Sequence, residues 1–316
     1  MSLPDHLAET QPTPTRLPGE GWPLDAYQPI RITRPPRRNR RKALIRGCLT
    51  VLLAGIILLA IYLLLPVRTN ILILGTDSRD LTDPTGRTDT IILTTIAPLR
   101  PDVAMLSVPR DLWVDVAGVG EQRINTAFFF AEIEEPGTGP QNAKATIQQN
   151  FGVEMDYYVL IQFEGLTTVV DSIGGVDVEI PRPMSGYDAG TVHMDGTQVL
   201  AFVRDRSGSD DFFRMERGQI FVKSLWQQLL APDQWNELPA LFGSLSAVLQ
   251  TDIPVWLYPR LGLALLRVGP DGIDNRVISR NEVNPFTTSG GAQVLGPDWP
   301  AIDLIVEELF GVTPER

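Results

Sequence analysis

Cysteine and histidine are scarce in this chain of 316 residues, which has one cysteine, Cys48, and two histidines, His6 and His193. A single cysteine excludes an intramolecular disulfide framework and a cysteine-rich zinc site. Two histidines are too few for a multi-histidine metal cluster. Any bound metal must therefore be held by oxygen ligands, which favours Mg²⁺, Mn²⁺ or Ca²⁺.

Lysine is almost missing from the greater part of the chain. Residues 47–316 contain 18 basic and 34 acidic residues, and 16 of the 18 basic residues are arginine. A guanidinium binds phosphate or carboxylate oxygens two at a time, which an ammonium group cannot do. The segment Val203–Gln219 holds four arginines and no lysine. Such clustering indicates a focused anion pocket; the alternative is that arginine-rich codon usage supplies ordinary surface ion pairs.

Charge is absent from residues 47–67, an apolar run of 21 positions. As a helix this run spans about 30 Å, enough to cross a bilayer core. Arg31–Arg46 contains eight basic residues and no acidic one, so the positive-inside rule places the N-terminus in the cytoplasm. We therefore predict a single-pass protein of the cell membrane: residues 1–46 form a disordered basic cytoplasmic tail, 47–67 a transmembrane helix, and residues 70–312 an extracellular domain.

Two other interpretations of the N-terminal region fit less well. A cleaved signal peptide is disfavoured because the apolar run is long and does not end at a small-x-small site. Nucleic-acid binding is disfavoured because membrane-flanking arginines need no other explanation and the domain that follows is strongly acidic. We therefore expect membrane lipid, and no nucleic acid, among the partners.

Short β-rich runs alternate with helical patterns from Asn70 onward, which predicts an α/β or α+β domain with helices covering a central sheet. Strands are expected near residues 70–74, 90–97, 103–108, 157–163, 176–180 and 276–279. Helices are expected near residues 124–132, 141–150, 164–173, 195–203, 210–230, 234–249, 255–266 and 301–310. No Pro/Ser linker divides residues 70–312, so we expect one domain.

Charged residues gather in three segments that follow strands. The loop Gly75–Thr90 alternates acidic and basic side chains and lacks the Gly-Lys-Ser/Thr of a Walker P-loop. Its carboxylates can converge on one hard cation. The second segment, SVPRD, can bring Arg110 to the same rim. In the third, Arg204 and Arg206 project to one side if residues 203–206 are extended, and Arg214 and Arg217 share a helix face at i and i+3.

A series of motifs follows the apolar run in a fixed order. They are NILILGTDSRD, GRTDTIIL, MLSVPRDLWV, RINTAF, DYYVLIQFEGL, VDSIGGVDVEIP, DGTQVLAFVRDR and DDFFRMERGQ. In this order and spacing, from about Asn70 to the C-terminus, the chain resembles the LytR–CpsA–Psr (LCP) family. The resemblance implies an α/β/α-like fold with a central mixed sheet flanked by helices. It also implies a membrane-anchored, extracytoplasmic phosphotransferase.

The resemblance carries over residue by residue. The Mg²⁺-ligating aspartates of the family fall on Asp77 and Asp89, with Mn²⁺ as the alternative ion. The phosphate-contacting residues fall on Arg79, Arg87, Arg110, Arg204, Arg206, Arg214, Arg217, Gln219 and Asn125. We single out Asp77, Arg110, Arg204 and Arg206 as the catalytic set. Departures from the family pattern are Thr88 for Ser, Val199 for Ala and Gly218 for Gln, none of which removes a charged site residue.

The implied reaction moves a glycopolymer, with its phosphate, from a polyprenyl pyrophosphate carrier to a sugar hydroxyl of peptidoglycan. Phosphoryl transfer requires charge neutralisation and positioning more than covalent help from the protein, which suits arginines and an aspartate-held Mg²⁺. Two alternatives stay open. One is a polyprenyl pyrophosphate phosphatase in which water replaces the acceptor, and the other is an envelope scaffold that binds lipid phosphate without turnover.

Overall fold

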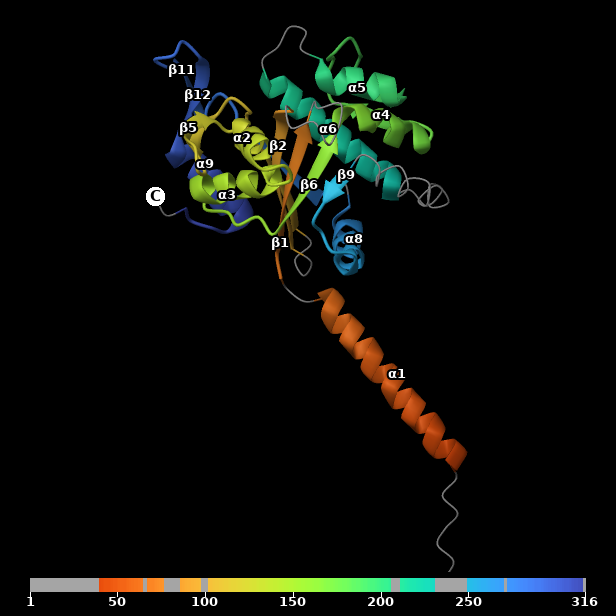
Figure 1. Ribbon diagram of the computed structural model, residues 1–316. Helices are drawn as coiled ribbons and strands as arrows, with labels where there is room; N and C mark the ends of the chain where they lie inside the picture. The colour runs from red at the N-terminus through yellow and green to blue at the C-terminus, as the bar shows by residue number, and fades with distance from the viewer. Residues whose placement is uncertain are drawn as a thin grey trace, which may run out of the picture. The chain divides into compact units, whose positions relative to one another are not determined.

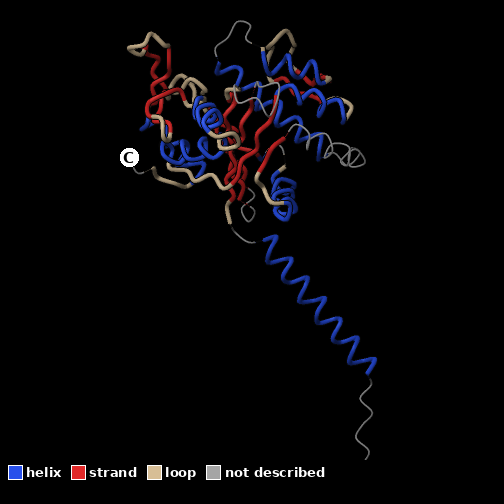
Figure 2. The backbone as a smooth tube through the Cα atoms, viewed as in Figure 1, coloured by secondary structure: helices blue, strands red, loops and turns tan. Residues whose placement is uncertain are grey.

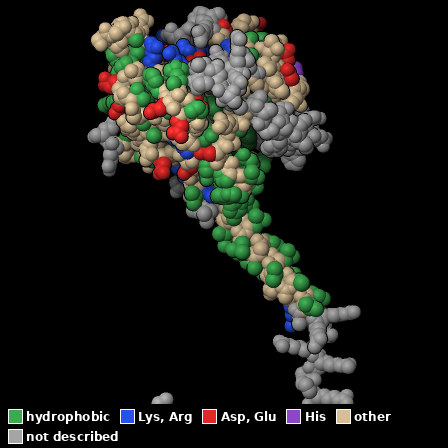
Figure 3. Space-filling model, viewed as in Figure 1, with side chains coloured by type: hydrophobic (Ala, Val, Ile, Leu, Met, Phe, Trp, Pro, Cys, Tyr) green, Lys and Arg blue, Asp and Glu red, His purple; other side chains and the backbone are tan. Residues whose placement is uncertain are grey.

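The N-terminal part of the described chain is one long helix. The computed structural model describes residues 40–64, 67–76, 86–97, 102–205, 211–230, 249–269 and 272–314 (Figure 1). The chain divides into two units, Met1–Ala54 and Gly55–Arg316. Helix α1 (Arg40–Leu64) contains Leu44–Leu63, which is long and apolar enough to cross a membrane by length and composition. None of this apolar window is buried, and the face of the helix seen in Figure 3 is largely hydrophobic.

A six-stranded mixed sheet forms the centre of the domain (Figure 2). Its order is β10 (Ile273–Val277), β3 (Asp102–Ser107), β2 (Thr88–Ala97), β1 (Thr69–Thr76), β6 (Tyr157–Gln162) and β9 (Leu249–Thr251). Strand β2 pairs antiparallel with both β1 and β3, while β6 runs parallel to β1 and β10 parallel to β3. The sheet is mixed because hairpin-like links join β1, β2 and β3, whereas helical crossovers lead to the parallel strands.

Both faces of the sheet are covered, because side chains along β1 alternate between them. Leu72 and Leu74 face a core shared with α2 (Thr126–Glu134), α3 (Gly139–Phe151) and α9 (Trp299–Phe310). Ile71 faces the other way, against Leu257 and Leu261 at α8 (Tyr258–Val268). Most residues of β1 and β2 are therefore buried on one side of the sheet or the other, which explains the near-continuous apolar sequence of these strands.

A second apolar cluster holds the elements that carry the arginine-rich segment. It joins α4 (Phe163–Ser172), the hairpin β7 (Val176–Ile180) and β8 (Gly190–Met194), α5 (Gly196–Arg204) and α6 (Asp211–Leu230). Helix α5 begins at a capping box, in which Asp195 Oδ1 accepts from the Gln198 backbone and Gln198 Oε1 accepts from the Asp195 backbone. This cap fixes where the helix starts, and so fixes Arg204 at its last turn.

The predicted fold class is confirmed, and most predicted elements lie within a few residues of their expected bounds. Two hairpins were not predicted: β4 (Trp113–Val116) with β5 (Gly120–Arg123), and β11 (Val283–Thr287) with β12 (Gln293–Pro297). Their strands are short, and β11 contains Pro285, a residue that argues against a strand unless the strand is at an edge. Most of the helix expected at 234–249 lies outside the described residues.

Candidate active site

The candidate site lies at the edge of the sheet where β1 and β3 end and β2 begins. The register pairs Thr76 with Thr88 across β1 and β2, and Ser107 with Ile92 across β3 and β2. Because β2 is antiparallel to both neighbours, Asp89 near its start and the turn after β3 come to the same edge. Lys and Arg side chains gather at this end of the domain in Figure 3.

Asp89 lies between two arginines from distant parts of the chain. Arg110 Nη1 is 3.0 Å from Asp89 Oδ1, and Arg214 Nη1 is 3.5 Å from Asp89 Oδ2. Arg214 Nη2 also donates a 2.7 Å hydrogen bond to the Asp89 carbonyl oxygen. Two guanidiniums thus share one carboxylate, on side chains that are only 11–22% exposed. Partial burial weakens screening, so these charges interact more strongly than they would in open solvent.

Asp111 and Arg123 extend this chain of charges, and neither was among the predicted site residues. Asp111 Oδ2 is 3.4 Å from Arg110 Nε, and Asp111 Oδ1 is 3.2 Å from Arg123 Nε. Arg123 Nη2 donates a further 2.8 Å hydrogen bond to the Gln293 carbonyl oxygen on β12. The sequence held a signal for both residues, because Arg123 is the first residue of the RINTAF motif and Asp111 is the last residue of SVPRD. Together they orient Arg110 and link the charged edge to the β11–β12 hairpin.

Arg214 and Arg217 occupy very different surroundings, although they lie three residues apart on α6. Arg217 is 3% exposed and its Nη2 donates to the Asp205 carbonyl oxygen. Burial lowers the pKa of the Arg217 guanidinium, while the charges of Asp205 and Glu216 act in the opposite direction. Arginine nevertheless stays protonated in proteins. Arg217 therefore places a positive charge behind the site, and its direct contact with phosphate remains a prediction.

Gln219 and Asn125 are both buried. Gln219 Nε2 donates to Ser107 Oγ at 2.9 Å and to the Arg276 carbonyl oxygen at 2.8 Å, which holds α6 against β3 and β10. The Asn125 backbone donates to the Arg110 carbonyl oxygen at 3.3 Å. Asn125 Oδ1 has no hydrogen-bond partner among the described residues. An unsatisfied buried acceptor costs about 1–3 kcal/mol, which a ligand hydroxyl would recover. Phosphate contact by either side chain is still a prediction.

Arg204 and Arg87 each lie over an aromatic ring. Arg204 Cζ is 5.9 Å from the Phe163 ring centroid, and Arg87 Cζ is 5.5 Å from that of Phe129. The condition of an extended chain at residues 203–206 is not met at Arg204, which is the last residue of α5. The helix extends this far because Val203 faces the apolar cluster. Stacking on Phe163 rather than strand geometry therefore sets the direction of Arg204.

Asp77, Arg79 and Arg206 lie outside the described residues. Among the described residues no group of three or more His, Cys, Asp or Glu side chains could hold a metal ion. The available donor chemistry still fits an oxygen-preferring cation such as Mg²⁺. Asp89 supplies a carboxylate beside Thr88, and Asp77 directly follows Thr76, which pairs with Thr88. Metal binding by Asp77 and Asp89 stays a prediction.

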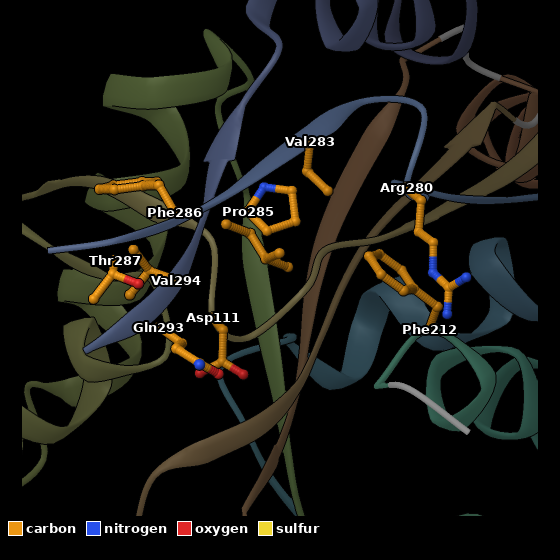
Figure 4. A pocket seen from close by; sticks show the side chains of 10 residues that line it. Asp111, Phe212, Arg280, Val283, Pro285, Phe286, Thr287, Gln293 and Val294 are labelled. Atoms are coloured by element: carbon orange, nitrogen blue, oxygen red, sulfur yellow. The ribbon is translucent and has the colours of Figure 1, made fainter. Parts of the chain in front are cut away.

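A groove of about 780 Å³ borders the charged edge. Figure 4 shows Asp111 and Gln293 side by side on one wall, with Arg280 and Phe212 at the other end. The Arg280 guanidinium lies over the Phe212 ring, with Cζ 5.9 Å from its centroid. The exposed Phe286 ring of the β11–β12 hairpin also lines the groove and packs edge-on against Trp113. Carboxylate, amide and aromatic groups together suit a polar ligand with apolar faces, such as a sugar.

The sequence profile of the LytR_cpsA_psr family matches residues 67–310. The chain belongs to this family. Among curated relatives, it is 31% identical over 236 residues to the "Polyisoprenyl-teichoic acid--peptidoglycan teichoic acid transferase TagU" of Oceanobacillus iheyensis, covering 73% of this chain and 69% of the relative. It is 27% identical to the "Regulatory protein MsrR" of Staphylococcus aureus, covering 59% of this chain and 57% of the relative.

Solved structures of similar fold agree with the LCP assignment. The crystal structure of B. subtilis TagV superposes with a TM-score of 0.65 at 22% identity, covering 79% of this chain and 99% of TagV. A structure described as "TagT bound to LIIa-WTA" superposes with a TM-score of 0.59 at 18% identity, covering 77% of this chain and 90% of TagT. These similarities confirm the predicted LCP fold. The charged edge described above is thus the candidate site of an LCP domain.

Proposed function

We propose that this LCP protein is a membrane-anchored transferase of cell-wall glycopolymers. Its donor is a glycan on a polyprenyl pyrophosphate carrier, and its acceptor is a sugar hydroxyl of peptidoglycan. The names of the TagU relatives support the general activity, and "TagT bound to LIIa-WTA" supports a glycopolymer substrate. In this proposal α1 spans the membrane once, with the N-terminus in the cytoplasm and the LCP domain outside.

The observation that carries the proposal is the position of Asp89 between Arg110 and Arg214. A pyrophosphate brings more negative charge than one carboxylate, so it competes for the two guanidiniums. Charge-assisted hydrogen bonds from arginine to phosphate contribute about 1.5–3 kcal/mol each. The two arginines would hold the pyrophosphate oxygens at the sheet edge, and Asp89, released from them, would become available to a cation.

In the proposed reaction the acceptor hydroxyl oxygen attacks the phosphorus atom that carries the glycan. The bond from that phosphorus to the bridging oxygen breaks, and polyprenyl phosphate leaves with the electron pair. A carboxylate at this edge takes the hydroxyl proton, and Asp77, one residue beyond Thr76, is the candidate. Asp77 and Asp89 would hold Mg²⁺, which supplies further neutralisation of charge on the transferring phosphoryl group. Arg110 and Arg214 stabilise the charge that develops on its oxygens.

The groove beside Asp111 offers room for the saccharide next to the phosphate. At about 780 Å³ it lies within the usual range of ligand sites. Phe286 presents an exposed ring for stacking against a sugar face, and Asp111 and Gln293 present polar groups for hydroxyls. The groove meets the charged edge at Asp111, so a sugar bound there lies beside the anion site.

The test uses the full-length protein with a lipid-linked glycan, in the presence and absence of a peptidoglycan-derived acceptor. Transfer predicts that the phosphate joins glycan to acceptor and that polyprenyl phosphate is released only when acceptor is supplied. Release at an equal rate without acceptor would instead establish the phosphatase alternative. Binding of the lipid without any release in either case would favour the scaffold. The Arg110→Ala, Arg214→Ala double variant serves as the inactive control.

A further inference from the structure

An apolar surface is exposed on α8 and on the short 3₁₀ turn before it, η3 (Val255–Leu257). Val255 is 76% exposed, Trp256 60%, Leu266 53% and Tyr258 41%. We call these four residues the α8 patch. Single exposed apolar residues are ordinary on proteins, but four large ones on one short segment indicate a contact surface.

The α8 patch is not a part of the core that happens to be loosely packed. The opposite side of the same segment is buried in the core, where Leu257, Leu261 and Ala264 pack against Ile71 and the neighbouring strands. The side of α8 away from the core carries Tyr258 near its start and Leu266 near its end, together with the exposed Arg267. Apolar side chains beside a basic one suit the boundary between water and lipid.

Chain connectivity places the α8 patch near the end of the apolar helix. Arg260 Nη2 donates a hydrogen bond to the carbonyl oxygen of Val67, which is itself 50% exposed. Only three residue steps separate Val67 from Leu64, the last residue of α1. Three steps reach at most about 10 Å. If α1 spans a bilayer, Val67 therefore lies within about 10 Å of its outer end, and the Arg260 guanidinium lies one hydrogen bond further away, whatever the angle of the domain.

The charge of this segment also differs from that of the rest of the domain. Residues 253–269 contain Arg260 and Arg267 and no acidic residue, whereas the whole chain has a net charge of −11. An acidic domain is repelled by a surface of anionic lipids. The α8 segment carries no acidic residue to oppose such a contact, and the exposed Arg267 adds an attraction of about 1 kcal/mol if it lies close to the surface.

We propose that the α8 patch inserts into the outer surface of the lipid bilayer as a second membrane contact beside α1. This inference rests on the single-pass topology of the proposed function. Trp256 and Tyr258 are the residue types that favour the headgroup region, and Val255 and Leu266 enter the acyl boundary. Two contacts fix the tilt of the domain, which a single tether leaves free.

The experiment uses the full-length chain in vesicles of mixed phosphatidylglycerol and phosphatidylcholine. Single cysteines are introduced into a Cys48→Ala background and labelled with an environment-sensitive fluorophore. Val255→Cys and Leu266→Cys probe the patch. Ile133→Cys and Phe286→Cys are matched controls, since both are exposed apolar residues outside it. Leu58→Cys, in the apolar helix, reports whether α1 lies in lipid. Thermal unfolding of each variant confirms that it is folded.

Insertion predicts that a quencher on the lipid reduces emission at Val255→Cys and Leu266→Cys at least about threefold more than at the two controls, because interfacial helices enter the bilayer by about 5–10 Å. Aqueous iodide should show the opposite order. If iodide reaches the patch as well as the controls while Leu58→Cys lies in lipid, the inference is wrong.

Two other results also overturn it. If neither quencher reaches the patch, a protein partner or a second copy of the chain covers it. If Leu58→Cys is itself reached by iodide, the single-pass topology fails and the inference fails with it. None of these readouts depends on phosphoryl transfer, so a failure of the proposed chemistry alone leaves the result on the α8 patch intact.

Discussion

The two edges of the central sheet carry opposite chemistry, although the same strands join them. Where β1 ends, Asp89, Arg110 and Arg214 hold one another by ion pairs and remain partly exposed. Where β1 begins, Arg260 is 6% exposed and binds a backbone oxygen, while Val255 and Trp256 face outward. Arg110 and Arg214 thus share a carboxylate at one edge, whereas Arg260 binds a backbone oxygen at the other. About 23 Å of β1, at roughly 3.3 Å per residue, separates the two.

This contrast separates arginines that can bind a ligand from arginines that stabilise the fold. An arginine whose partners are side chains of opposite charge can exchange them for the oxygens of a ligand. A buried arginine such as Arg260, which donates to a backbone carbonyl, chiefly stabilises the fold, because breaking the bond leaves a buried donor unsatisfied. The comparison predicts that substitutions at the end of β1 change activity, whereas those at its beginning change stability.

The largest effect is expected for Asp89→Ala. The substitution removes the predicted cation ligand and leaves Arg110 and Arg214 without their shared carboxylate. We expect transfer activity to fall at least about 100-fold, as for loss of one preorganised charge in an active site. Asp177→Ala is the control, because Asp177 pairs with His193 on the exposed β7–β8 hairpin and should retain activity. Mn²⁺ binding to the inactive variant, followed by electron paramagnetic resonance, separates loss of the cation from loss of phosphate binding. Normal turnover by Asp89→Ala would show that the candidate site is not the active site.

The next effect concerns the other edge. Arg260→Met keeps the volume of the side chain but loses the hydrogen bond to the Val67 carbonyl oxygen. We expect the free energy of unfolding to fall by about 1–3 kcal/mol, with activity unchanged within about twofold. Thermal unfolding in detergent provides the measurement. Arg267→Met, at an exposed position on the same helix, should change stability by no more than about 0.5 kcal/mol. A selective loss of activity in Arg260→Met would contradict the division between the two edges.

The Arg110→Lys variant tests whether the site requires the planar guanidinium group of Arg110 and not only its positive charge. An ammonium cannot bind two oxygens in parallel, nor can it contact Asp89 and Asp111 together as Arg110 does. We expect kcat/KM to fall about tenfold, equivalent to roughly 1.4 kcal/mol. Arg276→Lys is the matched control, since Arg276 forms exposed ion pairs with Asp274 and Glu308. Equal activities for the two lysine variants would show that Arg110 acts as a simple point charge.

The sequence predicted the charged edge better than the apolar one. Asp89, Arg110 and Arg214 each follow or begin a regular element, and the order of the strands then brings them together. Asp111 and Arg123 were missed as site residues because their role is to orient Arg110, a function that only side-chain geometry reveals. The helix expected at 195–203 is present, and it includes one residue more than expected, Arg204.

The α8 patch could not be predicted from periodicity. Residues 255–266 read as a helix, and the helix is present, but nearly every position in it is apolar. Which side faces the sheet is decided by Ile71, Ile96 and Val103, from strands more than 150 residues earlier in the chain. The β11–β12 hairpin was missed for a related reason. Pro285 argues against a strand in isolation, and only the position of the hairpin outside the central sheet makes a proline acceptable there.

The smallest effects on stability are expected for glycine-to-alanine substitutions in α6 and α8. They should be equal in the two helices, because they arise from the backbone alone. Gly218 on α6 and Gly262 on α8 both lie inside helices, and an added Cβ would meet no atom within 4 Å at either position. Gly218→Ala and Gly262→Ala should therefore each raise the free energy of unfolding by up to about 1 kcal/mol, the difference in helix propensity between glycine and alanine. Gly196→Ala is the opposing control, since its Cβ would lie 2.3 Å from the Thr167 carbonyl oxygen and should destabilise the fold by about 1–3 kcal/mol. Thermal unfolding distinguishes the three variants. A loss of stability in Gly218→Ala alone would mean that this glycine is required for α6 to present its arginines, so that the site edge depends on backbone shape as well as on charge.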